Sequence, residues 1–316
     1  MMTAFLFPGQ GSQSPGMGAD ISSTPEAGDL FGRADRILGF GLTKIFLHGP
    51  EEELRLTANA QPALVAVGVA CATLVAARGR EPSFVAGHSL GEYTALVIAG
   101  ALSFEDAVQA VHKRGRYMQE AVPVGRGAMA ALMGIELAPA LDLCREISSR
   151  GEELVQVAND NAPGQIVVAG HAAAVEVAMA EAKMRGARRA VRLPVSAPFH
   201  CDLMKPAAER LAEDLRATSF GDLRVPLVTN VDAREIRTGA EAREALTRQV
   251  TARVRWTESV RRLEELGAGA AVECGPGQVL AGLVKRISPS LPVIAAGDLP
   301  GIDRAAKQAA EGGARA

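Results

Sequence analysis

The sequence predicts an α/β protein built around a mostly parallel sheet, with a small α+β unit inserted into it. Two patterns carry this prediction. Short apolar runs that end in glycine or proline alternate with longer apolar-periodic stretches, as strands and helices alternate in α/β folds. In the middle of the chain the order becomes strand, helix, strand, strand, helix, strand, which matches the ferredoxin-like arrangement.

The first part of the chain supplies the opening elements of the larger body. Residues 3–7 are an apolar run that ends at a Pro-Gly pair, which predicts a buried strand and a tight loop. Residues 61–77 are apolar almost all round and predict a buried helix, and residues 83–86 predict a second strand. Ser103 and Asp106 match a capping box, so we expect a helix to begin after Ser103.

The inserted unit follows a Gly/Pro-rich break and is expected to occupy residues 124–194, between the two parts of the larger body at 1–123 and 195–316. Its predicted elements are, in chain order, residues 128–135, 138–149, 156–158, 165–169, 172–184 and 190–193. The last residues, from 307 on, are rich in alanine and glycine, and we expect this tail to be frayed.

Composition excludes several classes of function. The formal net charge of −2 creates no global field toward nucleic acid or an anionic membrane. The four cysteines form no CxxC pair, so they indicate neither a zinc site nor a disulfide framework. No signal peptide and no uninterrupted apolar stretch of membrane-spanning length is evident. We expect a cytoplasmic protein that binds no metal, nucleic acid or membrane.

Gly87-His88-Ser89-Leu90-Gly91 matches the G-x-S-x-G pattern. A predicted strand precedes it and a predicted helix follows, a context that holds the serine in a strained, exposed turn as a nucleophile. The helix N-terminus then offers backbone N–H groups to a developing oxyanion, and Leu90 is the expected donor. The alternative is an ordinary glycine-rich turn with an idle serine, and the strand–turn–helix context favours the nucleophile.

A serine nucleophile needs a base. The five histidines are His48, His88, His112, His171 and His200. His88 lies inside the elbow and should point away from Ser89, whereas His200 follows a predicted strand and a proline-stiffened loop, where α/β sheets place catalytic groups. His200 is therefore the candidate base. No aspartate between Ser89 and His200 is a clear third member of a catalytic triad, and Asp160 is the nearest candidate. A backbone carbonyl is the alternative acceptor for the second N–H of the imidazole.

Arg114 lies on the apolar stripe of the helix predicted after Ser103, three residues after Val111 and four before Met118. A buried arginine is costly unless it is paired. The commoner explanation is a structural salt bridge to an internal carboxylate, and the other is a fork that binds a substrate carboxylate. From the residues alone the salt bridge ranks first.

Several motifs occur in order over nearly the whole chain. They are FPGQGSQ at 7–13, GHSLGEY at 87–93, RGRYMQ at 114–119, NDNAPGQ at 159–165, PVSAPFH at 194–200, VTN at 228–230 and ECGPG at 273–277. Together they resemble the malonyl-CoA:acyl-carrier-protein transacylases of bacterial fatty-acid synthesis and the related acyltransferase domains of polyketide synthases. The resemblance implies a hydrolase-like α/β body that carries the ferredoxin-like insert.

The resemblance also implies roles for matching residues. Ser89 would be acylated, and His200 would act first as general base and later as acid. The backbone N–H groups of Gln10 and Leu90 would form the oxyanion hole. Arg114 would pair with the malonyl carboxylate, so the resemblance favours the substrate-binding fork over the structural salt bridge.

Gln249 matches the position whose main-chain carbonyl orients the histidine, in place of an aspartate. Phe199, His88 and Asn159 are assigned to the acyl pocket. Phe199 stands where many such enzymes have serine, and it resembles malonyl-selective polyketide members because its ring would crowd an α-methyl group. Residues 251–253, Thr-Ala-Arg, replace a more usual Tyr-Asn-Pro, so we expect the loop after Gln249 to differ.

The implied reaction is ping-pong transfer of malonyl from malonyl-CoA to the phosphopantetheine thiol of an acyl carrier protein, for fatty-acid or polyketide synthesis. The coenzyme A thioester is a substrate, and neither a cofactor nor a metal is expected. One rival is an acyl-thioester hydrolase of the same fold that clears stalled carrier proteins, and Arg114 argues against it. A second rival is an inactive docking scaffold. A basic cluster on the insert either steers the carrier protein or is a solvated face: Lys183, Arg185, Arg188, Arg189 and Arg192.

Overall fold

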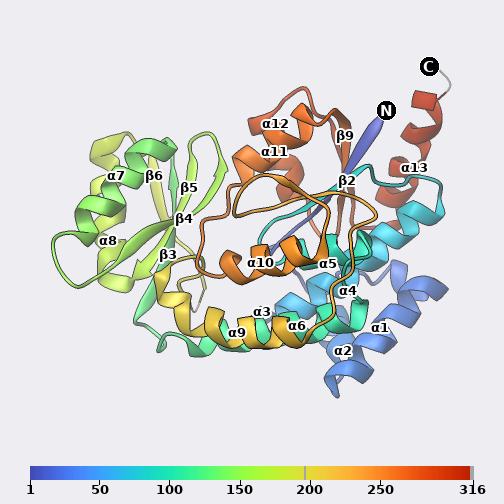
Figure 1. The fold of residues 1–316 in the computed structure, drawn as a ribbon, viewed down its shortest axis with the longest axis horizontal. Coiled ribbons are helices and arrows are strands. Elements are labelled where there is room, and N and C mark those ends of the chain that lie inside the picture. The colour runs from blue at the N-terminus through green and yellow to red at the C-terminus, as the bar shows by residue number, and fades with distance from the viewer. Residues whose placement is uncertain (196, 314–316) are drawn as a thin grey trace.

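Two sheets organise the protein in this computed structural model, which describes residues 1–195 and 197–313, with side chains through residue 307. The larger sheet has six strands in the order β10-β9-β1-β2-β7-β8 (Figure 1). Its neighbours from β10 to β7 pair in parallel and β8 is antiparallel. Its strands are β1 (Met2–Phe7), β2 (Phe84–Gly87), β7 (Leu227–Val228), β8 (Glu235–Ile236), β9 (Ala268–Cys274) and β10 (Val293–Ala296).

Helices cover both faces of this sheet. One layer, which includes α4 and α5, packs on β1, β2 and β9, while α11 and α12 pack on the other face against β7, β9 and β10. The helices of the larger body are α1 (Pro25–Leu38), α2 (Leu42–His48), α3 (Glu51–Arg55), α4 (Thr57–Ala77), α5 (Gly91–Ile98), α6 (Phe104–Glu120), α9 (Lys205–Ala217), α10 (Gly239–Gln249), α11 (Trp256–Glu265), α12 (Val279–Ile287) and α13 (Leu299–Gly313). Three short 3₁₀ turns are η1 (Ile21–Ser23), η2 (Lys183–Arg185) and η3 (Asp202–Met204).

Helix α4 is the central helix of the larger body. Its 21 residues are long and apolar enough to cross a membrane by length and composition alone, although Asn59 and Gln61 interrupt the apolar run. However, 83% of its apolar window is buried inside the protein, where it packs against α1, α5 and α6. A core helix needs an apolar surface on all sides when neighbours surround it, so its composition follows from its position.

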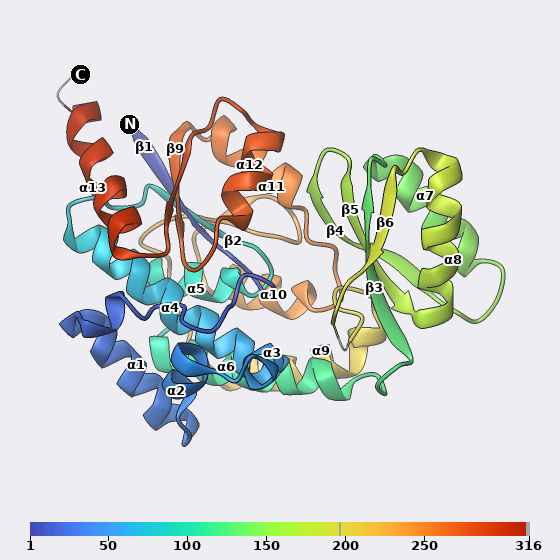
Figure 2. The ribbon, with the colours of Figure 1, turned by 180° about the vertical axis from the view of Figure 1, so that it is seen from behind.

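The smaller sheet is antiparallel and has the order β4-β5-β3-β6. With two helices on one face it has the predicted ferredoxin-like topology (Figure 2). Its elements are β3 (Gly127–Met133), α7 (Leu137–Ser148), β4 (Val155–Ala162), β5 (Gln165–His171), α8 (Ala172–Ala182) and β6 (Arg189–Arg192). A hydrophobic core of its own lies between the helices and the sheet. The α/β fold class is thus confirmed, while the division at residues 124 and 194 stays a prediction.

Strand β4 joins the smaller sheet to the larger body. It continues to Ala162, past the predicted end at residue 158, because its last residues pair with β5, with Asp160 opposite Ile166 and Ala162 opposite Gln165. In addition, Val254 N donates to Ala158 O and Asp160 N donates to Val254 O, both at 2.9 Å. The segment that follows α10 therefore runs alongside β4. Where we expected a frayed tail, α13 continues as a helix to Gly313, and residues 314–316 lie outside the described part.

Candidate active site

The G-x-S-x-G segment forms a sharp turn between β2 and α5. Ser89 has a φ of +50°, a left-handed conformation that side chains rarely adopt. A Cβ on Gly87 would lie 1.9 Å from Gly91 C, and one on Gly91 would lie 2.1 Å from Phe7 O. Both positions therefore require glycine, and the turn holds Ser89 at the carboxyl end of the parallel sheet, as a nucleophile elbow does.

Asn230, two residues after the end of β7, braces this turn. Its Oδ1 accepts a hydrogen bond from Ser89 N, and its Nδ2 donates to Gly87 O, both at 2.6 Å. Its own backbone N–H donates to the buried Glu92 carboxylate at 3.2 Å. The strained serine backbone is thus held by the Asn230 side chain, and Glu92 of α5 holds Asn230 in turn.

Ser89 Oγ lies 2.7 Å from His200 Nε2. The other ring nitrogen, Nδ1, donates to the main-chain carbonyl of Gln249 at 2.9 Å, which leaves Nε2 as the acceptor for the serine proton. Burial, and then the charge of Arg114, lower the pKa of His200 to about 3, so the imidazole is neutral at physiological pH. Asp160 has no part in this chain of contacts, because its carboxylate accepts from Thr257 Oγ1 at 2.9 Å.

Arg114 extends from α6 to the same serine. It is only 2% exposed, and its Nη2 donates to Ser89 Oγ at 3.2 Å. Two amide oxygens hold the guanidinium, Gln61 Oε1 at 2.9 Å and Gln249 Oε1 at 3.0 Å. Within the described residues no carboxylate forms an ion pair with Arg114, so the salt bridge that ranked first from the residues alone is wrong.

The two predicted oxyanion donors lie at the ends of adjacent strands. Phe7 of β1 pairs with Gly87 of β2, and Gln10 and Leu90 follow these two residues closely in the chain. Among the described residues, no acceptor is bonded to the backbone N–H of Gln10 or of Leu90. The Gln10 side chain donates to Thr57 Oγ1 at 3.2 Å, which ties its loop to the start of α4.

The three residues assigned to the acyl pocket lie around the elbow. His88 points away from Ser89, as predicted: its Nε2 lies 2.8 Å from Asn161 Oδ1, and its ring packs edge-on against Trp256. Phe199 is buried in the main core directly before His200. Asn159 is a buried residue of β4 and bridges to Val254. Their contact with an acyl group stays a prediction.

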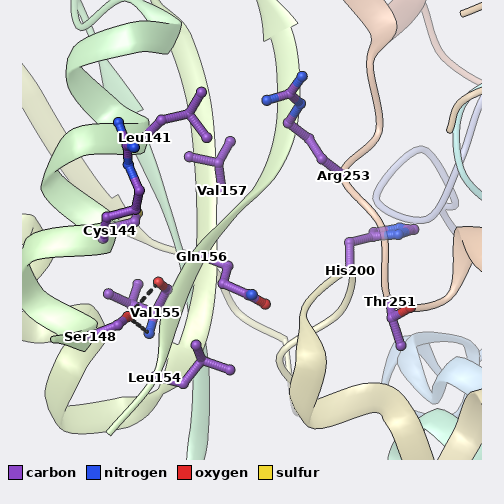
Figure 3. A pocket seen from close by; sticks show the side chains of 11 residues that line it. Leu141, Cys144, Ser148, Leu154, Val155, Gln156, Val157, His200, Thr251 and Arg253 are labelled. Atoms are coloured by element: carbon purple, nitrogen blue, oxygen red, sulfur yellow. Dashed lines mark hydrogen bonds between the residues drawn. The ribbon is translucent and has the colours of Figure 1, made fainter. Parts of the chain in front are cut away.

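A cavity of about 310 Å³ adjoins His200 between the two sheets (Figure 3). One wall is formed by α7 and β4, and the other by His200 and the segment after α10. Its lining residues are Leu141, Cys144, Arg145, Ser148, Leu154, Val155, Gln156, Val157, His200, Thr251 and Arg253. The cavity gives a ligand access to His200 from the side of the smaller sheet.

Sequence reasoning gave no role to Glu92, Asn230 or Gln61. Glu92 and Asn230 belong to matched motifs, and a charged residue directly after an elbow in an apolar helix was a signal that burial would require partners. Gln61 gave a weaker signal, a polar side chain at the start of an apolar helix. In the part of the chain described here, no group of three His, Cys, Asp or Glu side chains could hold a metal ion.

Comparison with known proteins shows the family of this chain. The family model described as an acyl transferase domain matches residues 4–298. The malonyl CoA-acyl carrier protein transacylase of Bacillus subtilis (strain 168) is 48% identical over 296 residues, covering 93% of each chain. The transacylase of the same name from Escherichia coli (strain K12) is 47% identical over 290 residues, covering 91% of this chain and 93% of that one.

Solved structures of malonyl transacylases also match this chain. A malonyl-transacylase in complex with its type II PKS acyl-carrier protein matches with a TM-score of 0.94 and 44% identity, covering 98% of this chain and 100% of that one. The malonyl CoA-acyl carrier protein transacylase of Coxiella burnetii matches with a TM-score of 0.94 and 44% identity, covering 97% of each chain. The chain therefore belongs to the acyl transferase domain family and, within it, to the malonyl CoA-acyl carrier protein transacylases.

Proposed function

We propose that Ser89 and His200 transfer a malonyl group from malonyl-CoA to the phosphopantetheine thiol of an acyl carrier protein. The observation that carries this assignment is the position of Ser89 Oγ, 2.7 Å from His200 Nε2 and 3.2 Å from Arg114 Nη2. A nucleophile with its base on one side and a buried cation on the other suits an acyl group that ends in a carboxylate.

In the first half-reaction Ser89 Oγ attacks the thioester carbonyl carbon while His200 Nε2 takes the hydroxyl proton. The oxyanion accepts hydrogen bonds from the backbone N–H groups of Gln10 and Leu90. The C–S bond then breaks, and His200 returns the proton to the departing thiolate of coenzyme A. Arg114 holds the free carboxylate of the malonyl group throughout.

In the second half-reaction the thiol of the carrier's phosphopantetheine arm attacks the malonyl-serine ester. His200 takes the thiol proton and delivers it to Ser89 Oγ as the ester C–O bond breaks. A neutral imidazole is needed at the start of both halves, and the low pKa of His200 supplies it. The chain's own groups perform each step, so we predict full activity in the presence of a metal chelator.

The partners follow from the family. The curated relatives are named for malonyl-CoA and the acyl carrier protein, and one solved relative is bound to a polyketide carrier. The product therefore feeds fatty-acid or polyketide synthesis. The basic cluster on η2 and β6 is one docking candidate, although Arg185 is paired with Glu146 and Arg192 with Glu176. Free, buried cysteines fit a reducing, cytoplasmic location.

Intact-protein mass spectrometry tests the proposal directly. The enzyme is mixed with malonyl-CoA or acetyl-CoA, and carrier protein is added afterwards. We expect a malonyl adduct that requires Ser89, is absent from Ser89→Ala, and moves to the carrier arm. Loss of the adduct to water in the presence of carrier would favour the hydrolase alternative. No adduct at all would favour an inactive scaffold.

A further inference from the structure

The cavity beside His200 has a cationic lining. Arg145 on α7 and Arg253 in the segment after α10 face it from opposite walls, and no aspartate or glutamate is among its described lining residues. A cavity lined by one sign of charge concentrates ligands of the other sign. This cavity therefore favours an anion, and Arg114 is not among its lining residues.

Of the two arginines that line the cavity, Arg253 has the weaker ion pair. Its nearest carboxylate is Glu258, with Nη2 3.5 Å from Oε1. Arg255 already holds both oxygens of that carboxylate, one of them from Nε at 2.8 Å. Arg253 Nε is buried, and among the described residues no acceptor is bonded to it. A buried donor without an acceptor is costly, so the guanidinium of Arg253 is incompletely paired within the protein.

Arg145 differs from Arg253 in its exposure and in its ion pairing. Its side chain is 77% exposed and is paired with Asp142 on its own helix, whereas the side chain of Arg253 is 23% exposed. Figure 3 shows the Arg253 side chain extending from the Thr251 segment toward the strand that carries Val157. Arg253 therefore lies on the wall of the same cavity that reaches His200.

The rest of the wall restricts the kind of ligand. Leu141, Leu154 and Val157 make part of it apolar, and Thr251 and His200 stand at its polar side. A ligand that fits has an anionic end at Arg253, an apolar middle against these side chains, and a reactive end at His200. The pantetheine arm has this order: a phosphate, a dimethyl-bearing carbon, two amides and the thiol or thioester.

We infer that Arg253 binds the phosphate of the pantetheine arm, the group that coenzyme A and the holo carrier protein share. The inference rests on the proposed malonyl transfer and adds a specificity residue to it. Because both half-reactions of a ping-pong enzyme bring a pantetheine arm to the same serine, one anion site serves both. The phosphate oxygens accept hydrogen bonds from the guanidinium N–H groups of Arg253 that Glu258 leaves largely free.

The test compares donors and acceptors that carry the phosphate of the pantetheine arm with ones that lack it, and uses coenzyme A and the carrier protein separately because the phosphate is what these two share. For the first half-reaction, malonylation of Ser89 is timed with malonyl-CoA and with malonyl-pantetheine, which has no phosphate. For Arg253→Ala we expect kcat/KM with malonyl-CoA to fall by roughly tenfold or more, the size expected for one charge-assisted hydrogen-bonded contact. The value with malonyl-pantetheine should stay within about twofold.

The second half-reaction uses holo carrier protein and free pantetheine as acceptors from malonyl-Ser89. The same pattern is expected, with a loss for the phosphate-bearing carrier alone. Arg253→Lys should fall between wild type and Arg253→Ala, because it keeps the charge without the fork. Arg262→Ala is the matched control: it removes an arginine paired with Glu265 on the exposed side of α11, outside the cavity lining, and should change nothing.

Several results would overturn the inference. Equal losses with and without the phosphate would make Arg253 a structural residue, and a thermal-unfolding measurement on the same variant would show the accompanying loss of stability. No loss with either donor would mean that no phosphate is bound there. A loss confined to coenzyme A would reassign Arg253 to the nucleotide's own phosphates. Failure of the wild type to form malonyl-Ser89 from either donor would instead refute the proposed function.

Discussion

Gln249 Oε1 accepts a hydrogen bond from Arg114 Nη2 at 3.0 Å, while the main-chain carbonyl of the same glutamine accepts from His200 Nδ1 at 2.9 Å. Its Nε2 donates to Ser89 O at 2.8 Å and to the Glu92 carboxylate. One residue at the end of α10 thus connects the proposed base, the proposed carboxylate fork and the elbow. Its backbone and its side chain serve different groups, so they can be separated by mutation.

Gln249→Leu should remove the side-chain contacts and keep the carbonyl that orients His200. Arg114 then loses one of its two amide acceptors, so we expect KM for malonyl-CoA to rise by roughly tenfold, equivalent to about 1.4 kcal/mol. The kcat value should change less, because His200 keeps its acceptor. Steady-state kinetics with malonyl-CoA check this. A fall in kcat at unchanged KM would mean that the side chain acts mainly through His200.

Arg114→Ala should selectively lose malonyl transfer. The guanidinium is buried and no carboxylate of the described residues is paired with it, so its removal eliminates the only interaction proposed for the malonyl carboxylate. We expect the ratio of malonyl to acetyl loading to fall by roughly 10²-fold, the scale of a buried charged contact. Loading is measured by mass spectrometry with both thioesters in competition.

The control for this experiment is Arg116→Ala. Arg116 lies two residues further along α6, its side chain is 56% exposed, and its Nη2 is 3.8 Å from Glu120 Oε1. The substitution therefore removes the same charge from the surface of the protein. Its malonyl-to-acetyl ratio should match that of the wild type. An unchanged ratio in Arg114→Ala itself would contradict the carboxylate-fork assignment and leave Arg114 with a purely structural role.

Glu92 should give the activity a pH dependence. Burial raises its pKa to about 7, even though hydrogen bonds from Gln249 and Asn230 and the charge of Arg114 oppose the shift. Both carboxylate oxygens accept hydrogen bonds, and a protonated carboxyl has one oxygen that donates instead. We therefore expect kcat/KM for malonyl-CoA to rise as pH increases through about 7. Glu92→Gln should lack this inflection, and a profile unaltered by the substitution would exclude Glu92 as its source.

Folding stability should depend on the same group with the opposite sign. The folded-state pKa of about 7 exceeds the ordinary value of 4.5, so the folded protein binds the Glu92 proton more tightly than the unfolded chain. The stabilisation is complete below pH 4.5 and is lost as pH rises to about 7, at most about 3 kcal/mol for this shift. Urea unfolding at pH 5 and pH 8 should show a smaller difference in Glu92→Gln than in the wild type.

The sequence predicted the parts of this site that depend on local geometry. The elbow follows from two glycines and a serine between a strand and a helix, and His200 followed from its place after a strand. Gln249 could not be derived from the residues, because the group that orients His200 is a backbone carbonyl and every residue has one. Only the resemblance named it. The extension of β4 was missed because it depends on backbone pairing with β5 and on long-range bonds to Val254, which the polar residues 159–161 do not reveal.

Arg114 shows where the reasoning from periodicity failed. The apolar stripe correctly predicted that the guanidinium is buried, and the need for partners followed from burial. The partners, however, are Gln61 on α4 and Gln249 on α10, two amides brought to α6 by the packing of helices far apart in the chain. Neutral acceptors that orient a cation without neutralising it leave its charge for a ligand. No pattern within α6 could distinguish this arrangement from a salt bridge.

Ser89→Gly and Ser89→Ala should both abolish acylation and should differ in stability. The φ of +50° at Ser89 costs a non-glycine residue roughly 1–2 kcal/mol, and glycine avoids this cost while losing about 0.5–1 kcal/mol through the greater freedom of the unfolded chain. Both variants lose the same hydroxyl contacts to His200 and Arg114, so their difference isolates the backbone term. We expect Ser89→Gly to be more stable by about 0.5–1 kcal/mol in urea unfolding. Equal stability would mean that the strain at Ser89 only equals the cost of glycine in the unfolded chain. A Ser89→Ala variant more stable by about 0.5–1 kcal/mol would mean that the elbow stores no strain at the nucleophile and that its geometry is set by the flanking glycines alone.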